Sequence, residues 1–107
     1  MASQKEYLYF ILEQLSGLPH ITYRAMMGEY LLYYGGKIFG GIFDNRFLVK
    51  AVKSAVEMMP DAEYEIPYPN AKPMLLVDNV DDREFLENLI RAMYNDLPFP
   101  KNNKKSK

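Results

Sequence analysis

Closely spaced turn residues constrain the fold of this chain more than any other feature of its sequence. Gly35-Gly36 and Asp44-Asn45 are pairs that tolerate the backbone angles of two-residue hairpin turns. They separate runs rich in β-branched, aromatic and other apolar residues, at Ile21–Met27, Tyr30–Tyr34, Lys37–Phe43 and Arg46–Val52. Because connections this short join antiparallel neighbours, residues 21–52 predict an antiparallel meander of three or four strands.

A glycine pair interrupts the third of these runs. Gly40 and Gly41 lie inside Lys37–Phe43, where glycine weakens a strand because it has no side chain to pack. We therefore expect a β-bulge or a close packing contact at this point.

Helical patterns flank the meander. At the N-terminus, apolar residues at helical spacing form one face, namely Leu8, Ile11, Leu12 and Leu15. Ser54 and Glu57 have the spacing of a capping box and predict a short helix that stops before Pro60. A last helix is expected to begin near Asp81-Asp82, and its apolar stripe consists of Leu86, Leu89, Ile90, Met93 and Leu97.

The segment before the last helix is rich in proline. Four prolines within residues 60–73 favour extended chain and turns, and Met74–Val77 reads as a short buried strand. With 107 residues, the chain has the size of a single domain, which we place at residues 1–100, followed by a disordered basic tail at 101–107. The expected fold is α+β, a two-layer sandwich with helices covering one face of an antiparallel sheet.

The residues offer little for catalysis. The chain has no cysteine and a single histidine, His20, which lies in a predicted loop. No serine occupies a nucleophile elbow, and Gly35-Gly36-Lys37 lacks the upstream glycine and the following hydroxyl of a phosphate-binding loop. We therefore expect a protein that is not an enzyme, with no cofactor, no metal site and no catalytic residues.

Charge and hydropathy narrow the expected partners. The 13 basic and 14 acidic side chains give a net charge of −1, but four lysines fall in residues 101–107, so residues 1–100 keep nine basic against fourteen acidic groups. An acidic body repels phosphate, so we expect weak nucleic-acid contact, aided by the tail. The longest apolar run, Tyr7–Leu12, is too short to cross a bilayer, and a cytoplasmic location without membrane contact is expected.

Aromatic residues crowd the meander, and alternation along strands sends them to both faces of the sheet. They are Tyr23, Tyr30, Tyr33, Tyr34, Phe39, Phe43 and Phe47, with Arg24, Lys37, Arg46 and Lys50 interleaved. Helices on one side leave the other face in need of a cover. The sequence is compatible with two covers: the proline-rich loop folding back over the sheet, or a partner protein.

Three stretches of this sequence resemble the N-terminal domain of the TfoX/Sxy competence regulators. They are Arg24-Ala-Met-Met-Gly28, Tyr30-Leu-Leu-Tyr-Tyr-Gly-Gly-Lys-Ile-Phe39 and Phe47-Leu-Val-Lys50. That family shows an Arg-x-Met-Phe-Gly run entering a hairpin, then a Gly-Lys-x-Phe turn and an aromatic-Leu-x-Lys strand end. Met27 stands where the family often has phenylalanine. The resemblance covers about residues 5–97.

The resemblance implies an α-β-β-β-α-β-β-α domain, similar to secretion-chaperone-like folds. It also implies regulation of DNA uptake together with the cyclic-AMP receptor protein in transcription. Full-length regulators carry a second, helical C-terminal domain, whereas this sequence ends in the lysine-rich tail, and we expect a stand-alone N-terminal domain.

Three functions remain open at this stage. The first is a regulatory protein-interaction domain that binds an unidentified protein or a second copy of itself, with a transcriptional accessory role. The second is a nucleic-acid-associated accessory protein that uses the lysine tail, and the third is a small-ligand-binding domain or an enzyme. The candidate interaction residues are Arg24, Met26, Met27, Gly28, Lys37 and Lys50. For Arg24, Met26 and Gly28, a structural role remains the alternative to a contact role: glycine allows a tight bend, methionine packs, and arginine pairs with a carboxylate.

Overall fold

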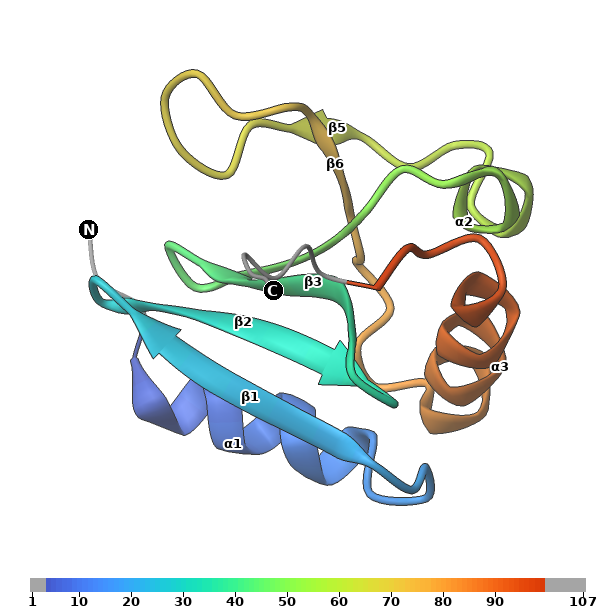
Figure 1. The fold of residues 1–107 in the computed structure, drawn as a ribbon, viewed down its shortest axis with the longest axis horizontal. Coiled ribbons are helices and arrows are strands. Elements are labelled where there is room, and N and C mark those ends of the chain that lie inside the picture. The colour runs from blue at the N-terminus through green and yellow to red at the C-terminus, as the bar shows by residue number, and fades with distance from the viewer. Residues whose placement is uncertain (1–3, 100–107) are drawn as a thin grey trace, which may run out of the picture.

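A computed structural model describes residues 4–99 of the chain (Figure 1). Within this range the helices are α1 (Lys5–Gln14), α2 (Lys53–Met58) and α3 (Arg83–Tyr94). The strands are β1 (Ile21–Met26), β2 (Glu29–Tyr34), β3 (Lys37–Phe43), β4 (Arg46–Val49), β5 (Tyr64–Glu65) and β6 (Met74–Leu76). The predicted basic tail at 101–107 lies outside the described residues.

The six strands form one sheet in the order β1-β2-β3-β4-β6-β5, with all neighbours antiparallel. The predicted α+β class is therefore confirmed. Four strands precede α2, one more than in the order implied by the family resemblance, because Asp44-Asn45 forms a true hairpin turn between β3 and β4. No helix within residues 4–99 is long and apolar enough to span a bilayer.

The meander is built from three hairpins whose two-residue turns all have positive φ at both positions. The turn residues are Met27-Gly28 (φ 51° and 85°), Gly35-Gly36 (58° and 86°) and Asp44-Asn45 (53° and 58°). Such turns match the right-handed twist of the flanking strands. The sequence predicted the second and third turns, whereas Met27 gives no turn signal because methionine rarely adopts a positive φ.

One face of the sheet, here called the inner face, packs against the helices. Tyr30 and Leu32 of β2 alternate inward, and side chains of all three helices join them in one buried cluster. From the helices the cluster includes Leu8, Ile11, Ala55, Leu86, Leu89, Ile90 and Met93. The apolar stripes predicted for α1 and α3 are therefore the faces that build the core.

The glycine pair in β3 produces the predicted irregularity. The register between β2 and β3 shifts between Leu32 and Tyr33, which marks a β-bulge. A Cβ on Gly40 would meet the backbone carbonyl oxygen of Leu48 and lie 2.9 Å from the Cα of Val49. The bulge and the close backbone approach thus occur together, and the close approach of β4 to Gly40 requires glycine.

The capping role predicted for Ser54 is wrong. The N-cap residue of α2 is Val52, which has no oxygen-bearing side chain to cap the helix, and Ser54 lies within the first turn. The carboxylate of Asp96, just beyond α3, instead accepts a hydrogen bond from the backbone N–H of Ser54 at 3.0 Å. The free N–H groups at a helix start need an acceptor, and here a distant segment supplies it.

This contact predicts an acid-dependent contribution to stability. Hydrogen bonding to Ser54 lowers the pKa of the Asp96 carboxyl from its ordinary value of 3.8. A carboxyl whose pKa is lower in the folded state stabilises the fold. This contribution is complete at pH values above the pKa of the unfolded state, and it disappears as the pH falls through the pKa of the folded state. We expect Asp96→Asn to destabilise the protein in urea unfolding at about pH 7 and the difference from wild type to shrink toward about pH 3. An equal difference at both pH values would contradict this role.

Candidate functional site on the outer sheet face

The face of the sheet opposite the helices, here called the outer face, carries three of the sequence-predicted candidates. On β1, Arg24 and Met26 lie opposite Leu31 and Glu29 of β2, and these positions alternate with the inward-facing ones. Lys50 follows β4 by one residue, and its backbone N–H donates to the carbonyl oxygen of Phe39 at 2.8 Å. It continues the outward alternation of Arg46 and Leu48.

The proline-rich connection between β5 and β6, residues 66–73, folds over part of the outer face. Phe43 and Leu48 are buried there, apart from the inner cluster, and Pro67 is buried with them. The Tyr68 ring lies 6.1 Å from the Phe43 ring, centroid to centroid. Of the two covers left open by the sequence, the loop therefore covers the β3–β4 side, whereas Met26 on β1 remains exposed.

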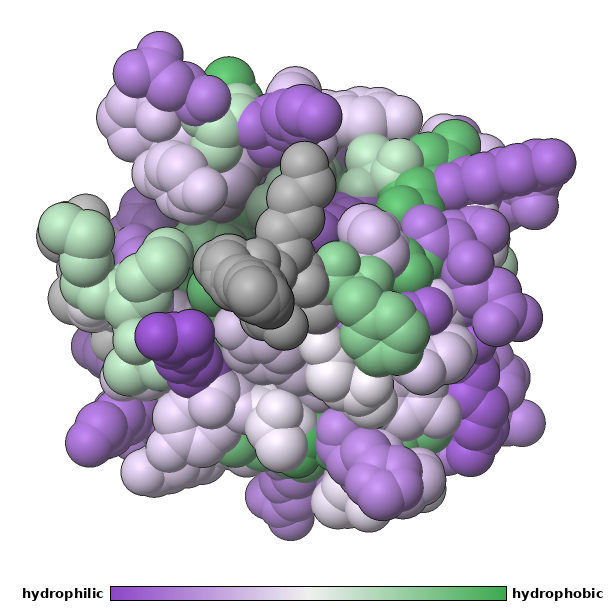
Figure 2. Space-filling view, in the orientation of Figure 1, coloured by the Kyte–Doolittle hydropathy of each residue, from purple (hydrophilic) through white to green (hydrophobic). Residues whose placement is uncertain are grey.

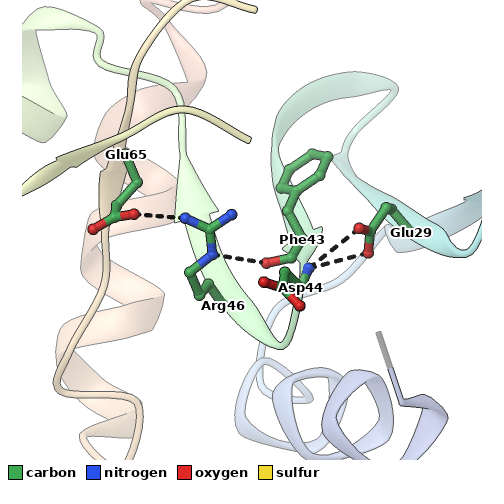
Figure 3. Close-up of polar contacts among 5 residues, drawn as sticks. All are labelled: Glu29, Phe43, Asp44, Arg46 and Glu65. Atoms are coloured by element: carbon green, nitrogen blue, oxygen red, sulfur yellow. Dashed lines mark hydrogen bonds and ion pairs between the residues drawn. The ribbon is translucent and has the colours of Figure 1, made fainter. Parts of the chain in front are cut away.

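A polar cluster fixes the start of this loop. Arg46 donates from Nη1 to the Glu65 carboxylate at 2.6 Å and from Nε to the carbonyl oxygen of Phe43 at 3.1 Å (Figure 3). At the Asp44-Asn45 turn, the two carboxylate oxygens of Glu29 accept from the backbone N–H of Asp44 at 3.2 Å and 3.3 Å. Arg46 of β4 thus ties Glu65 of β5, and with it the loop, to the sheet across the intervening strand β6.

Between the loop and the sheet lies a groove of about 630 Å³. Its floor comes from β2 and β3 and its wall from the loop, and the lining is mostly apolar: Met26, Leu31, Ile38, Gly40, Phe43, Lys50, Ala51, Val52, Pro67, Tyr68, Ala71, Lys72, Pro73 and Met74. Apolar side chains with a few polar groups are the usual composition of a binding pocket.

Two lysines supply the charge of this groove. Lys50 is half-buried, and both burial and the nearby charge of Lys72 lower the pKa of its ammonium group. Two cations of like charge beside one another are unfavourable in the free protein, and an anionic group bound between them would relieve that repulsion. The groove is therefore a local basic feature on an otherwise acidic body.

The remaining candidates lie elsewhere. Met27 and Gly28 form the β1–β2 turn, where Met27 is 97% exposed. Figure 2 shows a pale green patch over the tip of this hairpin, at the left of the view. Lys37 is buried on the inner side, and its Nζ donates to the carbonyl oxygen of Tyr94 at the end of α3 at 3.0 Å.

Sequence reasoning missed the residues of the loop. Lys72, Pro67 and Tyr68 belong to the proline-rich segment, whose sequence indicates extended chain but not where that chain lies. The pairing of β5 with β6 decides their position. No group of three metal-ligating side chains comes together within residues 4–99.

Fold and site define a class: a small α+β domain with an antiparallel sheet, one helix-covered face and a mostly apolar groove on the other. Residues 13–96 match the TfoX N-terminal domain, and the chain belongs to this family. A protein from Spirochaeta aurantia described as an "Uncharacterized 12.7 kDa protein in trpE 5'region" is 32% identical over 102 residues, which cover 94% of this chain and 89% of that protein. No solved structure matches the chain.

Proposed function

We propose that this chain is a non-enzymatic protein-interaction domain of the cytoplasm, which binds an acidic and partly apolar segment of a partner protein in the outer-face groove. The observation that carries the proposal is the pairing of Lys50 and Lys72 in an apolar groove. The lysines suit carboxylates of the segment, and the floor formed by Leu31 and Ile38 suits its apolar side chains.

The surroundings of the groove support a protein partner. Tyr and Met are enriched at protein interfaces, and the exposed side chains of Met26 and Tyr68 line the groove. Met27, next to Met26 at the hairpin tip, is also exposed. The anchored loop also argues for a preformed groove, since Arg46 and Tyr68 hold it before any partner binds.

The family resemblance supplies a context for the partner. Named members of the family regulate DNA uptake through transcription, and we propose an accessory role in transcription for this chain, exerted through a protein contact. Arg24 and Met26, which match the family's motif, lie on the groove side of the sheet.

The test is an affinity capture from lysate with wild type and the double variant Lys50→Glu/Lys72→Glu. We expect charge reversal to reduce recovery of the bound protein at least about tenfold, because acidic groups then repel the acidic segment. The matched control is Lys5→Glu/Arg91→Glu, which reverses two exposed charges on helices and should leave recovery unchanged.

Nuclease treatment separates the alternatives. A captured protein that resists nuclease and is lost in the groove variant supports the proposal. Loss of all captured material on nuclease treatment favours a nucleic acid held by Arg24, Lys50 and Lys72, and overturns it. Equal recovery with both double variants also places the contact outside the groove.

A further inference from the structure

The two edges of the sheet differ in how they are protected against pairing with another strand. β5, at one edge, has two residues and is followed closely by Pro67. β1, at the other edge, has six residues, carries no proline and pairs with β2 without a register shift. Short strands, prolines and bulges are common devices that block edge pairing, and β1 has none of them.

The backbone of β1 presents a regular row of hydrogen-bonding groups along its outer edge. The N–H of Gly35 donates to the carbonyl oxygen of His20, which fixes the phase of the β1–β2 ladder. Hydrogen-bonded and non-hydrogen-bonded pairs alternate along the ladder. The backbone N–H and C=O groups of Thr22, Arg24 and Met26 therefore form hydrogen bonds with β2. The N–H and C=O groups of Ile21, Tyr23 and Ala25 therefore point outward, where no described strand pairs with them.

These three residues suit pairing with an identical strand. Two copies related by a twofold axis align their β1 edges antiparallel. When Tyr23 of one copy lies opposite Tyr23 of the other, Ile21 lies opposite Ala25 on both sides, and all three outward residues exchange two backbone hydrogen bonds each.

Neighbouring registers are worse. When Tyr23 lies opposite Ile21 or opposite Ala25 instead, only two residue pairs exchange backbone hydrogen bonds. The register with Tyr23 opposite Ala25 also places Arg24 opposite Arg24, where like charges repel. In the Tyr23-centred register, Arg24 lies opposite Thr22.

The ends of β1 carry complementary features. A hollow of about 460 Å³ lies where α1 ends and β1 begins, lined by Leu12, Leu15, Ser16, Leu18, Ile21, Thr22 and Tyr23. At the other end is Met27, 97% exposed and held at φ 51°, a conformation costly for methionine. In the Tyr23-centred register, Met27 of each copy lies opposite Pro19 of the other, beside the hollow of that copy.

From these features we propose that two copies of the chain associate through β1, centred on Tyr23, with Met27 of each copy seated in the apolar hollow beside α1 of the other. The occupant of this edge is a second copy because the register, the position of Arg24 and the pairing of Met27 with the hollow are all self-complementary. The interface lies at the sheet edge and leaves the groove residues Lys50 and Lys72 accessible.

Sedimentation equilibrium of the full chain tests the proposal. Wild type should form a dimer with a concentration-dependent equilibrium. Ala25→Pro removes an outward N–H that β2 does not use, and the dimer should dissociate at least about tenfold more readily. Ala25→Lys should also weaken the dimer. Its matched control is Ala92→Lys, at a position inside α3, which should leave dimerisation unchanged.

A second variant separates association from folding. Met27→Asn creates an Asn-Gly turn, which favours the positive φ at this position, so the folded monomer should become more stable. The same change removes the methionine from the hollow, and the dimer should weaken. An increase in stability with unchanged dimerisation overturns the seating of Met27.

Cysteine scanning tests the register, since the chain has no native cysteine. Under mild oxidation, Tyr23→Cys should form a covalent dimer more readily than Thr22→Cys or Arg24→Cys, because residues opposite themselves come within disulfide reach. A wild type that stays monomeric at all concentrations, or preferred cross-linking at position 24, overturns the proposal. Neither result bears on the groove, whose test uses Lys50 and Lys72.

Discussion

Gly40→Ala is expected to destabilise the protein by about 3 kcal/mol or more, a large part of the stability of a small domain. The added Cβ would meet the carbonyl oxygen of Leu48 and the Cα of Val49, which are backbone atoms of β4. Because β4 is held between β3 and β6, neither can withdraw without disturbing the centre of the sheet. Urea unfolding monitored by circular dichroism measures the loss.

Gly17→Ala is the matched control for this variant. Its Cβ would meet the carboxylate end of the Glu87 side chain, which can swing away. We expect its free energy of unfolding to stay within about 0.5 kcal/mol of wild type. If Gly40→Ala is as stable as Gly17→Ala, β3 and β4 do not approach as closely as described.

Lys37→Met is expected to destabilise the protein by about 2 kcal/mol. The ammonium group of Lys37 donates to the carbonyl oxygen of Tyr94 at the C-terminal end of α3, where the helix dipole favours a cation. It also lies 4.0 Å from the centre of the Tyr94 ring and 4.8 Å from that of Phe99. Methionine keeps the length of the side chain but removes the charge and the donor. The Tyr94 carbonyl then loses its charged donor and retains the hydrogen bond from the backbone N–H of Leu97 at 3.2 Å.

Lys53→Met provides the comparison, because Lys53 is exposed at the start of α2. Its unfolding free energy should stay within about 0.5 kcal/mol of wild type. The groove test adds a second readout: Lys37→Met should leave capture of the partner unchanged, since Lys37 does not line the groove. A selective loss of capture with unchanged stability would instead assign Lys37 to a binding surface.

The distinct positions of Lys37 and Lys50 show why a linear pattern identifies a candidate but not its surroundings. Both lysines border aromatic strands in the sequence. The bulge in β3 and the pairing of β2 with β3 turn Lys37 inward toward α3, whereas Lys50 continues the outward alternation of β4. Which face a lysine occupies depends on register, and a single bulge can change it.

The sequence by itself determined the elements that depend on neighbouring residues. The glycine pair at 35–36 and Asp44-Asn45 specified hairpin turns, and the apolar spacing of α1 and α3 specified their buried faces. The family motif at Arg24–Gly28 also belongs to this local information. These features could be read because the backbone preferences and periodicities that produce them act over a few residues.

Only the tertiary structure decided what distant segments bring together. It placed Lys72 beside Lys50 by folding residues 66–73 over the sheet, and it capped α2 with Asp96 from beyond α3. It also left β1 at the edge of the sheet formed by residues 4–99, with Met27 at one end and an apolar hollow at the other. The contact between Ser54 and Asp96 joins residues 42 positions apart. Contacts of this kind arise from strand pairing and from the burial of a shared core, which no local pattern encodes.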